Sequence, residues 1–110
     1  MIDDVILTTI ETIPGADVEE HYGLVTGTSV KTLSKLASFV GNIKMFFGGE
    51  ITGYSTFLED ARKDATKQMI EAAKKHGANA IVSVRYETAT ASPGVIEISA
   101  YGTATKIVKY

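Results

Sequence analysis

The side chains in this 110-residue chain that are best suited to metal chemistry lie near its start. Glu19 and His21 are two positions apart, and residues two apart in an extended strand share one face. A carboxylate and an imidazole on the same face can both bind a divalent metal ion. Glu19 and His21 are therefore the candidate metal ligands, whereas Glu20 between them would point to the opposite face.

The remaining potential ligands fit a metal site poorly. Soft and borderline metal ions are usually held by several Cys or His side chains with short spacing. The chain has no cysteine, and its second histidine, His76, is far from His21 in sequence. The spacing therefore does not support a bound divalent metal cofactor, unless symmetric copies of the chain bring several sets of ligands together.

A second candidate site follows the glycine-rich segment 48–53, GGEITG. Helix N-termini attract anions, and Tyr54 and Arg62 lie in the first part of the helix predicted after this segment. These two residues are the candidates for binding a small anion. Glu50 would repel an anion, and no Gly-Lys-Ser/Thr of a phosphate-binding loop is present. The alternative is that Arg62 forms an ion pair at the surface or between subunits.

No group of residues in the sequence is typical of an active site. The serines lack the Gly-x-Ser-x-Gly context of a hydrolase nucleophile. General acid–base catalysis needs a polar group held in a pocket, and no carboxylates are paired in the sequence. We predict no catalytic residue and expect that the protein is not an enzyme.

Charge and hydropathy argue against two classes of partner. Eleven basic residues are balanced by thirteen acidic ones, and the net charge of −2 disfavours a nucleic acid. No uncharged apolar run reaches the roughly 18 residues of a membrane span. Acidic residues stand at positions 3 and 4, where a secretion signal would be positively charged. We expect a cytoplasmic protein in which residues 1–110 form one domain.

The element that would position the second site is a long helix over residues 54–76. Thr56 and Glu59 form a capping-box pattern, and Gly77 is suited to the left-handed position after a helix. Apolar and mostly small residues recur at spacings of three and four along one face, which predicts close packing on a sheet: Leu58, Ala61, Ala65, Met69, Ala72, Ala73 and His76.

Alternating patterns predict strands on both sides of this helix, over residues 5–9, 18–27, 79–88 and 95–108. Gly23 suggests a bulge in the second strand. In the third, alternation places Ile81 with Arg85 and Glu87 on one face and Val82 with Tyr86 on the other. The last two strands would form an antiparallel hairpin, separated by a loop over residues 88–94.

A shorter helix is predicted over residues 28–47, where apolar residues follow a three–four spacing from Leu33 to Phe47. Phe39 and Phe46 widen its apolar arc beyond what one core contact requires. Such a patch favours a subunit interface, and the alternative is a crowded core. The order of elements predicts an α+β two-layer sandwich, an antiparallel sheet covered by the long helix plus the shorter one.

Five short segments together resemble the YbjQ family of small bacterial and archaeal proteins: Tyr22–Gly27, Gly48-Gly49, Ala61-Arg62, Gly77–Val82 and Gly102–Ala104. The resemblance covers nearly the whole chain. It implies a dodecin-like subunit fold, a ring-like homo-oligomer, most often a pentamer, and a heavy-metal-binding family label without an established activity. Many members carry arginine after the paired glycines, where this chain has Glu50.

Two functional hypotheses follow. The first is a non-enzymatic, homo-pentameric ring with a binding or structural role, and it is favoured by the wide apolar arc of the shorter predicted helix. The second is a heavy-metal-binding or metal-responsive protein, which depends on His21, Glu19 and the symmetry of a ring.

Overall fold

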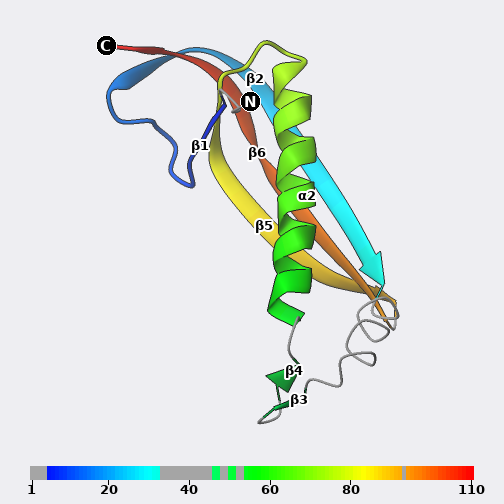
Figure 1. The fold of residues 1–110 in the computed structure, drawn as a ribbon. Coiled ribbons are helices and arrows are strands. Elements are labelled where there is room, and N and C mark those ends of the chain that lie inside the picture. The colour runs from blue at the N-terminus through cyan, green and yellow to red at the C-terminus, as the bar shows by residue number, and fades with distance from the viewer. Residues whose placement is uncertain (1–4, 33–45, 48–49, 52–53, 93) are drawn as a thin grey trace.

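The computed structural model describes residues 5–32, 46–47, 50–51, 54–92 and 94–110. The elements in chain order are β1 (Ile6–Leu7), β2 (Ala16–Thr32), β3 (Phe46–Phe47), β4 (Glu50–Ile51), α2 (Tyr54–Lys74), β5 (Ala80–Ser92) and β6 (Val95–Lys109). Helix α2 lies along one face of a sheet of long strands, as Figure 1 shows. The fold is therefore α+β with two layers, as the sequence predicts.

The sheet has the strand order β1-β5-β6-β2, so β6 is central and β2 forms one edge. The three long strands are antiparallel to their neighbours, whereas β1 is parallel to β5. The sheet is therefore mixed, and the prediction of a purely antiparallel sheet is wrong for this first short strand. The N-terminal strand runs beside β5 because its backbone groups pair with those of residues 79–84.

Helix α2 forms where the sequence predicts it and ends as predicted. It begins at Tyr54, one residue before the capping candidates, so Asp60 lies in the second turn. Gly77 has a φ of 85°, and the amide of Ala78 donates to the carbonyl of Ala73 at 3.2 Å. This hydrogen bond closes the last turn of the helix in the manner of a Schellman motif.

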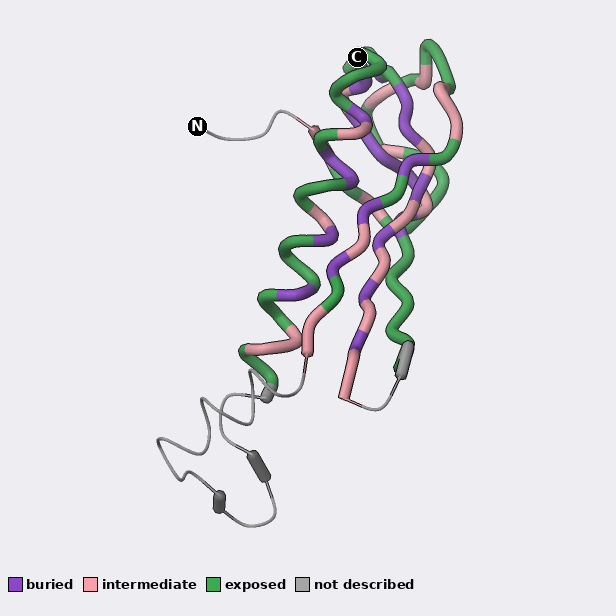
Figure 2. Tube along the Cα trace, turned by 90° about the vertical axis from the view of Figure 1, so that its right-hand side faces the viewer, coloured by how far each residue is buried: buried purple, intermediate pink, exposed green. Residues whose placement is uncertain are grey.

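The core lies between α2 and the facing side of the sheet. Figure 2 shows that the buried positions of α2 are on the side turned to the strands. Alternate residues of β6 from Ile96 to Ala104 are buried, as predicted. The predicted face of α2 is buried at Ala61, Ala65, Met69 and Ala73, while His76 is exposed and stacks on Tyr22.

Two irregularities, one in β2 and one in β5, change the predicted alternation. Residue Gly23 lies at a register shift, which confirms the predicted bulge, and Tyr22 consequently packs against the core. In β5 a register shift between Val82 and Arg85 surrounds Ser83, whose φ is 56°. Ile81 therefore belongs to the buried cluster with Val84, and its predicted placement beside Arg85 is wrong because the bulge reverses the alternation.

The predicted helix over residues 28–47 is wrong at both ends. Residues 28–32 continue β2, where they pair with residues 95–99 of β6, and Phe46–Phe47 pair with Glu50–Ile51 as two short strands. Residues 33–45 lie outside the described residues. The ladder to β6 pairs the backbone groups of this segment that face β6, which outweighs the three–four apolar spacing. The same pairing extends β5 to Ser92, through most of the predicted loop.

The closest approach between the two layers is at Gly27. A Cβ atom at this position would overlap the carbonyl oxygen of Ala65 and lie 2.6 Å from the backbone nitrogen of Met69. The helix backbone therefore rests almost directly on β2. Two polar contacts hold the same strand to the helix: Gln68 Oε1 accepts from the amide of Thr28 at 3.1 Å, and Lys31 pairs with Asp64 at 2.9 Å.

We expect Gly27→Ala to lower the free energy of unfolding by about 1–3 kcal/mol or more, since the methyl group must push α2 away from β2. Urea denaturation at one fixed protein concentration measures this change. The matched control is Thr26→Ala, on the opposite and exposed face of the same strand, which should change the value by about 0.5 kcal/mol or less. Equal stability of the two variants would contradict the close contact.

The positive φ of Ser83 gives a second expectation about stability. Ser83→Gly should raise the free energy of unfolding by about 0.5–1 kcal/mol, because glycine adopts this conformation without steric cost. Ser83→Val should lower the stability, since a β-branched residue is disfavoured at positive φ. Thermal unfolding of both variants provides the measurement, and a stabilising valine would show that Ser83 is not strained.

Candidate functional site

The described part of the chain has a concave surface between α2 and β5, which forms a groove. Its volume is about 510 Å³, and we call it the α2–β5 groove. Its lining combines cationic, hydroxyl and apolar side chains: Glu59, Arg62, Lys63, Thr66, Lys67, Ile70 and Tyr86. The groove exists because α2 is seated on β2 and β6 and makes few contacts with β5.

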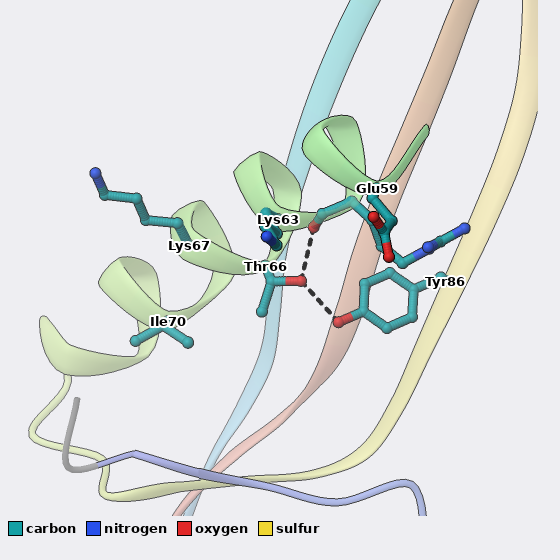
Figure 3. Close-up of a pocket in the computed structure, with 7 residues that line it drawn as sticks. Glu59, Lys63, Thr66, Lys67, Ile70 and Tyr86 are labelled. Carbon is teal, nitrogen blue, oxygen red and sulfur yellow. Dashed lines mark hydrogen bonds between the residues drawn. The ribbon is translucent and has the colours of Figure 1, made fainter. Parts of the chain in front are cut away.

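A hydrogen-bond chain connects the two walls of the groove. The hydroxyl of Thr66 donates to the carbonyl of Arg62 at 2.7 Å. Its single proton is thereby used, so the Tyr86 hydroxyl, also 2.7 Å away, donates to Thr66 Oγ1 (Figure 3). Neither hydroxyl retains a proton for a ligand, and anion binding in the groove would depend on its cationic side chains.

Three cationic side chains and one carboxylate line the groove. Arg62, Lys63 and Lys67 are exposed, and no ion pair of theirs occurs among the described residues. Lys67 points away from Tyr86 in Figure 3, so its charge lies toward the rim. The arrangement can attract an anionic group but does not surround one, because no buried polar donor converges on a single point.

The structure places the two anion-site candidates differently. Arg62 lines the groove, as an exposed side chain on α2. Tyr54 is the first residue of α2, eight positions earlier, which corresponds to about 12 Å along the helix axis. The backbones of the two candidates are thus about two helical turns apart. The sequence did not predict the other residues that line the groove with Arg62, which include Lys63, Thr66, Lys67 and Tyr86.

The metal-ligand candidates lie on β2, on the far side of the sheet from the groove in strand order. Glu19 and His21 are both exposed, and a register shift between Val18 and Glu20 interrupts the regular alternation that would place them on one face. Within the described ranges, no group of three or more His, Asp or Glu side chains could hold a metal ion. The donor set of the described residues in one copy therefore does not fit a heavy-metal site.

Two tyrosines, Tyr22 on β2 and Tyr110 beside the start of β2, have raised pKa values. Partial burial raises the pKa of the Tyr22 hydroxyl above its usual value, and the carboxylates of Glu20 and Glu19 raise it further. At the end of the sheet, a hydrogen bond from Tyr110 to Asp17 Oδ1 (3.0 Å) raises the pKa of Tyr110. Both phenols therefore stay protonated near neutral pH.

The chain is similar to known proteins over nearly its whole length. Residues 5–108 match the YbjQ family model, which is described as "Putative heavy-metal-binding". The chain belongs to this family. It is 41% identical over 99 residues to a UPF0145 protein of Hahella chejuensis, covering 90% of this chain and 95% of that protein. It is 40% identical over 107 residues to a UPF0145 protein of Archaeoglobus fulgidus, covering 97% and 99%.

A solved structure supports the fold. The crystal structure of a protein of unknown function from Pediococcus pentosaceus, assigned to the DUF74 family, aligns with a TM-score of 0.63. The alignment covers 94% of this chain and 98% of that one at 18% sequence identity, so the similarity concerns the fold alone. Among the described residues of this YbjQ-family chain, no helix is long and apolar enough to cross a membrane.

The family description makes metal content worth measuring. Because Glu19 and His21 have no third ligand beside them in one copy, we expect protein purified without chelator to carry no metal above the level of its buffer. Elemental analysis by inductively coupled plasma mass spectrometry tests this expectation. Stoichiometric metal that disappears in His21→Ala but persists in His76→Ala would overturn it and would support a metal site formed between copies.

Proposed function

We propose that this YbjQ-family chain is the subunit of a homo-oligomeric ring, a pentamer, with a binding or structural role and no catalytic activity. The observation that carries the proposal is the exposed edge strand β2. This strand has 17 residues and no partner beyond β6 in the described structure, and Leu24 and Val30 on it are 72% and 58% exposed.

A long edge strand with exposed apolar side chains is a liability in a monomer. Unpaired amide and carbonyl groups on such an edge recruit other strands, and single chains usually blunt them with charges, proline or a covering element. On this edge of β2 the amide of Thr28 is satisfied by the side chain of Gln68 rather than by another strand. A defined contact with another copy of the chain would use this edge in a controlled way.

A binding or structural role fits the chemistry of the described residues better than catalysis does. The α2–β5 groove is open and lined by exposed cations, and both hydroxyl groups in its lining are already engaged in the hydrogen bonds between Tyr86, Thr66 and the carbonyl of Arg62. Heavy-metal binding is the alternative role, supported by the family description alone, and it would require ligands contributed by several copies.

Native mass spectrometry of the untagged protein tests the assembly directly. The subunit mass is 11.8 kDa, so a pentamer should appear at about 59 kDa, five times that mass. Additional mass that is lost on denaturation would reveal a carried ligand. A species of 11.8 kDa at micromolar concentration would contradict the proposal, because the exposed edge of β2 would then be tolerated in a monomer.

A further inference from the structure

The β2 side and the β5 side of the molecule are complementary in two respects. Each side ends in a strand edge with unpaired backbone groups, and the two sides carry opposite charges. The sheet has two open edges, one along β2 and one along the far end of β5. Helix α2 carries carboxylates on its β2 side, and on its β5 side the three cations Arg62, Lys63 and Lys67 outnumber the single carboxylate Glu59. These features suggest how one copy contacts the next.

The first open edge lies on β2. The amide of Thr28 points away from β6, since it donates to Gln68 on the other side. Antiparallel pairing alternates the direction of the backbone groups, so the amides of Thr26 and Val30 point the same way. Neither has a hydrogen-bond partner among the described residues. The Gln68 side chain is exposed and can rotate away if a neighbouring strand approaches.

The second open edge lies on β5. The N-terminal segment covers β5 only as far as Val84, whose amide donates to the carbonyl of Thr8 at 2.9 Å. By the same alternation, the amides of Tyr86, Thr88 and Thr90 point away from β6. Every described residue from Arg85 to Thr90 is exposed. The sheet therefore ends on this side in a second unpaired edge.

The two edges are parallel to each other, because both β2 and β5 are antiparallel to β6. Rotation about an axis along the strands would bring the β2 edge of one copy to the β5 edge of the next with the strand direction preserved. Contacts between two different surfaces of this kind are heterologous, and they close into rings when the rotation permits.

The charged side chains of α2 also differ between the side of the helix near β2 and the side near β5. Asp64 lies on the β2 side, where it pairs with Lys31, and Asp60 and Glu71 occupy the same stripe at spacings of four and seven. We call these three residues the acidic flank. The opposite flank is the α2–β5 groove with Arg62, Lys63 and Lys67, which lack a described ion-pair partner.

We propose that copies of the chain contact one another head to tail, so that the β2 edge and acidic flank of one copy lie against the β5 edge and α2–β5 groove of the next. The inference rests on the homo-oligomer proposed above and specifies its interface. Asp60 and Glu71 of the acidic flank then supply ion-pair partners for Arg62 and Lys63, which have none among the described residues. Complementary charges of this kind fix the register and orientation of an interface.

Disulfide cross-linking tests the contact, since the chain has no cysteine of its own. Val30 and Ala89 are exposed and both pair with Glu97, so within one chain they are two strand spacings apart, about 9.5 Å. That separation exceeds the roughly 7 Å limit for a disulfide, so a bond between them must join two copies. Oxidised V30C/A89C should give a ladder of covalent oligomers on a denaturing gel.

Two further variants complete this experiment. The chain V30C/E87C, with the second cysteine two residues earlier on the same face, covers a shifted register. Each single-cysteine variant is the control, and it should stay monomeric on the gel because identical positions do not meet in a head-to-tail contact. Cross-links in V30C alone, or none in either double variant, would overturn the proposed interface.

Charge reversal provides the second readout. R62E/K63E should raise the apparent dissociation constant of the assembly by about tenfold or more at low salt, since the groove would face carboxylates. Adding D60K/E71K to the same chain should restore assembly, because both sides of every contact are then reversed. The control K106E/K109E makes the same change in net charge at the end of β6 and should assemble like the wild type.

The outcomes separate the two proposals. A wild-type monomer in native mass spectrometry would refute the ring itself. A wild-type ring that neither forms the cross-links nor responds to R62E/K63E would leave the ring in place and refute the head-to-tail contact between the β2 and β5 flanks.

Discussion

The contact between Gly27 and the backbone of α2 sets the geometry of the whole subunit. A side chain at position 27 would lift the helix off β2, and the small side chains of Ala61 and Ala65 allow the same close approach from the other layer. Glycine and alanine thus act together, one on the strand and the others on the helix. Their contact fixes α2 over β2 and β6 and leaves β5 largely uncovered.

This off-centre position of the helix explains the candidate site. A helix centred on the sheet would bury the inner side of β5, including Tyr86, which is 40% exposed here. Instead the Tyr86–Thr66 hydrogen bond spans an open groove with cations along its wall. The same displacement brings the acidic side of α2 over β2. The two flanks of the subunit consequently differ in charge, which favours contacts between unlike surfaces.

The sequence predicted the elements that depend on local patterns. Helix α2 with its Gly77 stop and the alternation of β6 were correct because periodicity and capping are local properties. Residues 28–32 were predicted wrongly because their strand pairing depends on residues 95–99, far away in sequence. The reversal of faces at Ser83 was also missed, since a serine gives no signal for a bulge at positive φ.

Only part of the candidate site was accessible from sequence. Arg62 was identified from its charge and its place near the start of the helix, and Lys63 and Lys67 at neighbouring helical positions could have been added on the same ground. Tyr86 could not, because it reaches the groove only through the packing of β5 beside α2. For the metal candidates Glu19 and His21, the described residues form no group of three or more potential ligands, so any complete site needs donors from elsewhere.

The topology also constrains the order of events during synthesis. β6 is the central strand and the sole long partner of β2, and the pairing runs from Ala16 opposite Lys109 to Thr32 opposite Val95. The ribosome must therefore complete residues 95–109 before β2 can pair with β6, its strand partner in the described structure. Such long-range contacts carry a large loop-closure cost and slow folding. Until β6 emerges, both sides of β2 and its exposed Leu24 and Val30 are unprotected. Nascent chains are thus most vulnerable to mispairing late in translation.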